Sequence, residues 1–125
     1  MTTAPPREMT RGDTPIWDLA VVDTAGAPFS LTGYTTRMTA KYSLDDPDSA
    51  ALFQLSTATG EITYTDAAGG LATIQPLRSS TSALTTDVTV WCDVQIAKDG
   101  LPDVTYTVVR PWALAIRRDV TEDAP

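Results

Sequence analysis

Short apolar stretches separated by turn sequences recur along residues 11–74, and this spacing constrains the fold more than any other feature. The turns are rich in Asp, Gly, Pro and Ser, which supply the backbone conformations of tight turns. Between the turns, apolar and polar residues alternate with a period of two, as in a β-strand with one buried face. Residues 34–44 are the cleanest case. There we expect a buried face formed by Met38, Ala40, Tyr42 and Leu44.

The alternation predicts about seven strands. They cover residues 14–22, 34–44, 51–55, 61–65, 71–75, 88–97 and 104–118. Residues 77–84 are predicted to form a short helical crossover between two sheets. The last strand carries an apolar stripe at its even positions, and Pro111 interrupts its ladder, which predicts a bulge or a sheet edge there. Strands of this number and spacing are typical of an antiparallel, all-β, immunoglobulin-like sandwich.

The chain of 125 residues has the size of one domain. We assign residues 11–118 to the sandwich. Residues 1–10 are polar and contain prolines, so we expect an extended N-terminal arm, and residues 119–125 are predicted to be an acidic C-terminal tail. Segments of this kind become ordered mainly when a partner holds them. Pro5, Pro6 and Arg7 are therefore candidate partner contacts.

The composition argues against several classes of function. The net charge is −7 and the nine basic residues are scattered, whereas a nucleic-acid surface needs clustered Lys and Arg. No apolar stretch approaches the roughly 18 residues needed to cross a membrane. Histidine is absent and Cys92 is the only cysteine, which excludes Ser-His-Asp and Cys-His catalysis and His-ligated zinc. We therefore expect no enzyme activity, no cofactor, and neither nucleic acid nor membrane as a partner.

Three local features have a functional and a simpler structural interpretation. Cys92 shares a strand face with Val88, Val90, Val94 and Ile96, so a small buried side chain is favoured over a reactive thiol.

The carboxylates of Asp45, Asp46 and Asp48 form the densest acidic cluster, and oxygen ligands on a loop can hold calcium. Pro47 and the missing glycine and distal glutamate of an EF-hand loop favour a solvated turn instead. The sequence Arg11-Gly12-Asp13 matches the tripeptide that integrins read. A tripeptide recurs by chance, so we interpret it as a turn that leads into a strand.

The three tryptophans fall on different faces of their predicted strands. Trp17 and Trp112 share a face with aliphatic residues, which predicts core packing. Trp91 lies on the face opposite Cys92 and is a candidate partner contact, because tryptophan is enriched at interfaces. If the sandwich bound glycans, Trp91, Tyr34 and Tyr64 would be the candidate aromatic platform.

Several motifs follow one another from residue 11 to residue 74, within a match that spans roughly residues 11–118. They are Arg-Gly-Asp-Thr-Pro at 11–15, Asp-Thr-Ala-Gly-Ala-Pro-Phe-Ser-Leu-Thr-Gly at 23–33, Lys-Tyr-Ser-Leu-Asp-Asp-Pro-Asp at 41–48, Ala-Leu-Phe-Gln at 51–54, Gly-Glu-Ile-Thr at 60–63 and the turn and strand of 69–74. This order resembles tailed-bacteriophage baseplate proteins, and more narrowly the N-terminal domain of upper baseplate proteins. The resemblance implies a β-sandwich without catalytic residues that serves as an assembly part of a virion.

The leading hypothesis is therefore a structural virion component of a tailed bacteriophage, located in the baseplate, tail, neck or capsid surface. Its expected partners are other virion structural proteins, within a symmetric homo-oligomer assembled in the bacterial host cytoplasm. The alternative is a glycan-binding sandwich that recognises the host surface.

Overall fold

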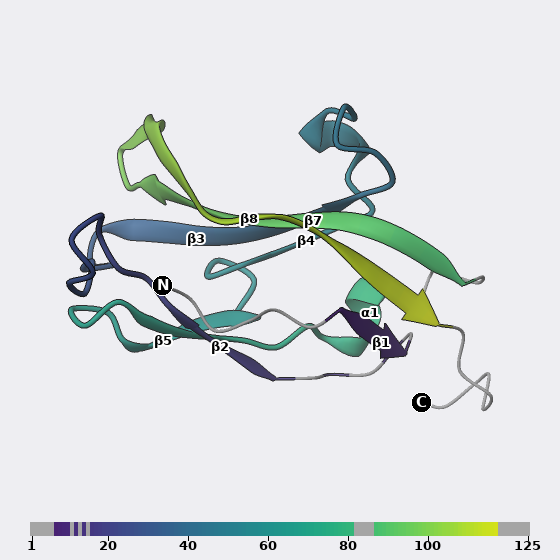
Figure 1. Ribbon diagram of the computed structural model, residues 1–125, viewed down its shortest axis with the longest axis horizontal. Coiled ribbons are helices and arrows are strands. Elements are labelled where there is room, and N and C mark those ends of the chain that lie inside the picture. Colours follow the sequence, from purple (N-terminus) through teal and green to yellow (C-terminus); the bar gives the residue numbers. More distant parts are fainter. Residues whose placement is uncertain (1–6, 11, 13, 15, 82–86, 118–125) are drawn as a thin grey trace.

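The computed structural model describes residues 7–10, 12, 14, 16–81 and 87–117, which form two β-sheets packed face to face (Figure 1). The larger sheet has five strands in the order β1-β8-β7-β3-β4, and the smaller has three in the order β2-β6-β5. The strands of the larger sheet are β1 (Glu8–Thr10), β8 (Leu101–Arg117), β7 (Val88–Lys98), β3 (Tyr34–Lys41) and β4 (Phe53–Ser56). Those of the smaller sheet are β2 (Trp17–Ala20), β6 (Leu71–Ile74) and β5 (Ile62–Asp66).

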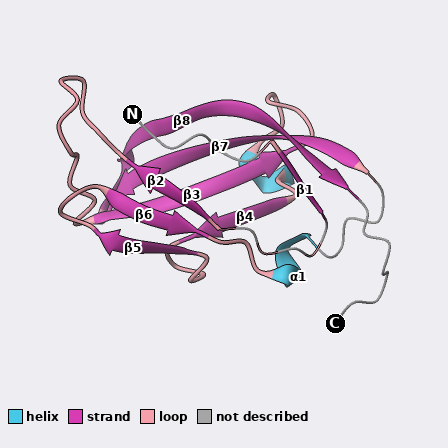
Figure 2. Cartoon of the chain, turned by 60° about the horizontal axis from the view of Figure 1, so that its bottom comes forward, coloured by secondary structure: helices cyan, strands magenta, loops and turns pink. Residues whose placement is uncertain are grey.

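Two short helical segments join strands of the sandwich (Figure 2). The 3₁₀ helix η1 (Asp48–Ala50) lies between β3 and β4, and the helix α1 (Arg78–Thr81) lies between β6 and β7. Because β6 and β7 belong to different sheets, α1 confirms the predicted helical crossover.

The strand order confirms the predicted immunoglobulin-like sandwich. In that fold strands B, E and D form one sheet, and strands G, F, C and C′ form the other. Here β2, β6 and β5 take the places of B, E and D, while β8, β7, β3 and β4 take those of G, F, C and C′. All seven predicted strands are present, with boundaries that differ by a few residues.

An eighth strand lies within the segment that we expected to be an extended arm. β1 pairs with β8 in parallel, with Glu8 opposite Ala115 and Thr10 opposite Arg117, so the larger sheet is mixed and not wholly antiparallel. The side chain of Met9 is buried in the core, and the backbone N–H of Ala115 donates to the carbonyl of Arg7. Met9 is the one apolar residue of β1, and a single residue shows no periodicity in the sequence.

The core lies between the sheets and contains both tryptophans that were predicted to be buried. The rings of Trp17 and Trp112 meet edge to face, with centroids 5.9 Å apart. This geometry is favourable because the edge of one ring carries positive charge and the face of the other negative charge. The largest fully buried side chains around them are Leu19, Leu31, Met38, Leu55, Ile62, Ile74, Ile96, Leu114 and Ile116.

The predicted buried face of residues 34–44 is wrong at its end. β3 stops at Lys41, and the side chains of Tyr42 and Leu44 are 56% and 53% exposed. The strand stops because a turn begins at Ser43, where the N–H of Asp46 donates to the Ser43 carbonyl over 3.0 Å.

The predicted bulge at Pro111 is confirmed. Cys92 lies opposite Trp112 and Val94 opposite Val109, so two residues of β8 face one residue of β7 between these pairs. A second shift follows between Val94 and Gln95. Each shift moves side chains from one face to the other. Val109 is consequently buried, although it lies at an odd position and outside the predicted stripe.

Candidate functional site

The outer edge of β8 is the longest stretch of strand edge that has no described strand beside it. One edge of β8 pairs with β7, but the other pairs only with β1, over Ala115, Ile116 and Arg117. No described strand covers that outer edge from Leu101 to Leu114. The edge of a sheet is a place where another strand can pair.

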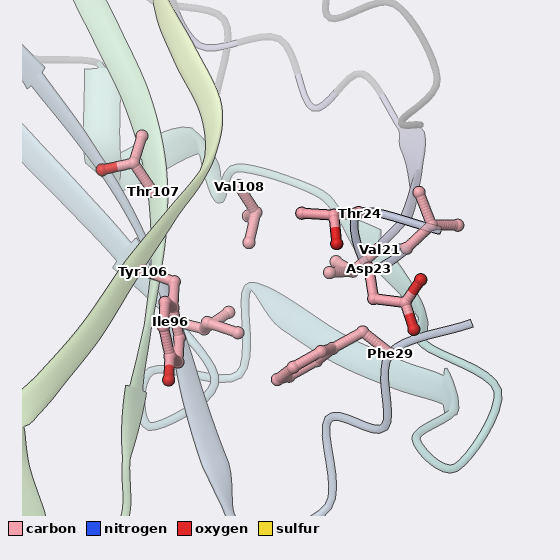
Figure 3. A pocket seen from close by; sticks show the side chains of 9 residues that line it. Val21, Asp23, Thr24, Phe29, Ile96, Tyr106, Thr107 and Val108 are labelled. Atoms are coloured by element: carbon pink, nitrogen blue, oxygen red, sulfur yellow. The ribbon is translucent and has the colours of Figure 1, made fainter. Parts of the chain in front are cut away.

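A cavity of about 500 Å³ lies beside this edge, between the two sheets. Figure 3 shows Tyr106, Thr107 and Val108 of β8 with Ile96 of β7 on one side, and the segment after β2 on the other. The residues contributed by that segment are Val21, Val22, Asp23, Thr24 and Phe29. Most of the lining is apolar, as in sites that accept apolar groups.

Backbone hydrogen bonds hold the wall formed by the segment after β2. The N–H of Val21 donates to the Gly70 carbonyl over 2.9 Å, and the N–H of Phe29 donates to the Val21 carbonyl over 2.9 Å. The carboxylate of Asp23 accepts the N–H groups of Ala25 and Ala27 at 2.9 and 3.0 Å. The wall is therefore a closed turn fixed to the β5–β6 connection.

Three aromatic rings form a cluster at the cavity. The centroids of Phe29 and Tyr34 are 5.4 Å apart, those of Phe29 and Tyr106 6.2 Å, and those of Tyr34 and Tyr106 6.5 Å. Tyr106 belongs to the apolar stripe predicted at the even positions of the last strand, and half of its side chain is exposed. It faces the same side of the sheet as Ile96, opposite which it lies, and there it borders the cavity.

Trp91 lies at a second, smaller hollow on the outer face of the larger sheet. Its side chain is 38% exposed, which agrees with the predicted outward orientation. The hollow has a volume of about 240 Å³. Its lining consists of Thr39, Lys41, Leu44, Trp91, Cys92, Asp93 and Pro111.

The three candidate aromatic residues of a glycan platform do not come together. Tyr34 lies opposite Lys98, seven residues along β7 from Trp91, which is roughly 23 Å at the rise of a strand. The hydroxyl of Tyr64 donates to the Tyr34 carbonyl over 2.7 Å and lies 2.8 Å from the hydroxyl of Thr36. Burial raises the pKa of Tyr64. Tyr64 therefore helps to join the two sheets, and Trp91 stands apart from it.

The acidic cluster forms the turn favoured by the sequence. The carboxylate of Asp46 accepts the N–H of Ser43 over 3.2 Å, and the N–H of Asp45 donates to the Ser43 hydroxyl over 3.3 Å. The side chain of Asp48 lies outside the described part of the structure. Within the part that is described, no three His, Cys, Asp or Glu residues are grouped so as to hold a metal ion.

The structure describes some of the remaining candidate residues named in the sequence analysis. Cys92 is buried as predicted, and its burial, assisted by the negative charge of Asp93, raises its pKa to about 12. Gly12 donates its N–H to the Thr81 hydroxyl over 2.8 Å, whereas Arg11 and Asp13 lie outside the described residues. Pro5 and Pro6, two of the candidate partner contacts, also lie outside the described residues. Arg7, another of these candidates, is exposed.

Sequence reasoning missed the cavity and one buried carboxylate. Glu61 is only 5% exposed and accepts hydrogen bonds from the Leu77 N–H and the Thr59 and Ser80 hydroxyls, at 2.8, 3.0 and 2.7 Å. It ties the start of β5 to the residues around α1, which is a structural task. No pattern in the sequence distinguishes it from an exposed glutamate of a turn.

No helix in the described residues has the length and apolar character needed to span a membrane. Comparison with known proteins gives no match, either to a model of a protein family or to a curated protein.

Proposed function

We propose that this protein is a structural component of a tailed-bacteriophage virion that acts by assembly with neighbouring subunits. The observation that carries the assembly role is the outer edge of β8, along which no described strand pairs from Leu101 to Leu114. The resemblance of the motif order to upper baseplate proteins supports the virion assignment. A stable sandwich with one long open edge suits a part whose work is to hold its neighbours.

The assignment is tested on particles of the phage that encodes this chain. Purified virions are analysed by mass spectrometry, and a deletion of the gene is compared with the parent by electron microscopy. We expect the chain at a fixed copy number per particle and incomplete particles from the deletion. Intact, infectious particles that lack the chain would refute the assignment.

A glycan-binding role is the second candidate, and it now depends on Trp91 alone. An exposed indole beside a hollow of about 240 Å³ is the observation in its favour. This role predicts saturable binding on a glycan array that falls at least tenfold on Trp91→Ala. Tyr106→Ala, at the other cavity, serves as the matched control. Equal array profiles for the two variants and the parent would remove this candidate.

A further inference from the structure

The larger cavity combines apolar walls with two aromatic rings. Phe29 and Tyr106 both belong to its lining, and their ring centroids are 6.2 Å apart. Figure 3 shows the side chain of Phe29 pointing across the cavity toward Tyr106 and Ile96. A cation in this space can therefore lie within the roughly 6 Å over which an aromatic ring attracts positive charge.

A third ring holds these two in place. The centroid of Tyr34 lies 5.4 Å from that of Phe29 and 6.5 Å from that of Tyr106. Tyr34 is fixed in turn, because its carbonyl accepts the hydroxyl of Tyr64 over 2.7 Å. Rings that are fixed before a ligand arrives lose little conformational entropy when it binds. The aromatic pair is therefore preorganised for binding.

Asp23 adds a negative charge to the cavity. Among the described residues that line it, Asp23 is the one with a charged side chain. Its Oδ1 accepts the N–H groups of Ala25 and Ala27, whereas its Oδ2 accepts no hydrogen bond from a described residue. Lys98, which lies opposite Tyr34 on β7, is exposed and is not among the described lining residues. The described lining thus offers a carboxylate oxygen and supplies no cation of its own.

We propose that this cavity accepts a lysine side chain of a neighbouring protein. The four-carbon stem of lysine is apolar and suits the walls formed by Val21, Ile96 and Val108. Its ammonium group suits the aromatic rings and the carboxylate. Arginine suits the cavity less well, because its five N–H donors need acceptors and the described lining offers few.

The partner is a different and more basic protein. A second copy of this chain is disfavoured as the donor of the lysine, because each copy brings a net charge of −7 to the contact. A basic partner surface complements this charge. The inference rests on the proposed assembly role, for which it names the chemistry of the partner.

The test compares two five-residue peptides that differ in one charge. One is Gly-Ser-Lys-Ser-Gly with blocked ends. In the other, norleucine replaces lysine and keeps the carbon stem without the ammonium group. Each peptide is titrated into the full chain and followed by NMR. We expect saturable shifts at residues 21–29 and 106–108 with the lysine peptide, and binding about fivefold weaker with the norleucine peptide. Equal binding of the two peptides would overturn the proposal.

Asp23→Asn tests the carboxylate, because the new amide oxygen can still accept the two backbone N–H groups. We expect the lysine peptide to bind this variant about threefold more weakly. Asp18→Asn is the matched control, since Asp18 is exposed on β2, lies outside the described lining and changes the net charge by the same amount. It should leave binding unchanged. Equal weakening by the two substitutions would indicate general attraction to an acidic protein and would exclude a specific site.

Tyr106→Leu tests the aromatic contribution. It should weaken binding of the lysine peptide about fivefold, whereas Tyr42→Leu, at an exposed tyrosine just after β3, should leave binding unchanged. Thermal melts verify that the variants remain folded. The proposal fails if Tyr106→Leu has no effect. It also fails if the chain self-associates with concentration-dependent shifts at the same residues, because a second copy would then occupy the cavity.

The outcome is distinguishable from that of the virion assignment. A chain that binds the lysine peptide at the cavity but is absent from particles keeps the site and loses the virion assignment. A chain that is present in particles but does not distinguish the two peptides keeps the virion assignment and loses the site.

Discussion

Gly70 fixes the wall of the cavity through its backbone. Its φ of +75° lies in the left-handed region, and an added Cβ would lie 2.5 Å from the carbonyl oxygen of Val21 and 2.7 Å from that of Phe29. Gly70→Ala should therefore lower the free energy of unfolding by about 3 kcal/mol in urea titration. Gly26→Ala is the control, because its φ is +83° with nothing within 4 Å, and should cost about 1 kcal/mol. Equal losses would contradict the close approach.

Cys92 makes stability depend on alkaline pH. Its pKa is about 12 in the folded protein against a usual value of 9.0, so above pH 9 the unfolded chain loses a proton that the folded chain keeps. Stability contributed by the neutral thiol is complete below pH 9 and falls by about 1.4 kcal/mol per pH unit up to the folded pKa. Between pH 8 and pH 10.5 the parent should lose about 2 kcal/mol more than Cys92→Ala. Parallel losses would indicate an accessible thiol.

At the scale of elements, β1 is the strand whose contribution is most easily tested. Met9→Ala removes a buried side chain and should cost about 2–3 kcal/mol of unfolding free energy. Glu8→Ala is the matched control, since Glu8 is exposed and its carboxylate lies 3.8 Å from the exposed guanidinium of Arg117. It should cost under about 0.5 kcal/mol. If Met9→Ala were as mild as Glu8→Ala in the same titration, residues 8–10 would belong to a free arm.

The elements also show what could be predicted from the sequence. Strands with several alternating apolar residues, such as β3 and β7, are visible because burial of one face imposes a period of two. β1 has one apolar residue and no period. The burial of Val109 depends on the register shifts that flank it in β8, of which only the one at Pro111 has a signal in the sequence.

The candidate site was predicted less well than the fold, for a physical reason. The outward orientation of Trp91 follows from its position opposite Cys92, so strand alternation was sufficient. The cavity lies where no described strand pairs with β8 beside Tyr106 and Val108, and where a turn places Phe29 across from them. Alternation of apolar and polar residues predicts which strand face is buried. It does not predict where a cavity lies between the sheets.

At the scale of the whole molecule, the described strands of the sandwich pair with the outer edge of β8 only at its β1 end. Under the proposed assembly role, contacts with neighbouring subunits form on this side of the sandwich. The stability of the isolated chain and the stability of the assembly are then separate quantities. Substitutions in the core should affect the first, and substitutions at the cavity beside β8 should affect mainly the second.

A cryo-electron microscopy map of the assembled particle tests this account most directly. We expect density for a neighbouring polypeptide in contact with the outer edge of β8 and with the cavity between Phe29 and Val108. A map in which this edge and the cavity face solvent, while the subunit contacts its neighbours elsewhere, would contradict the account.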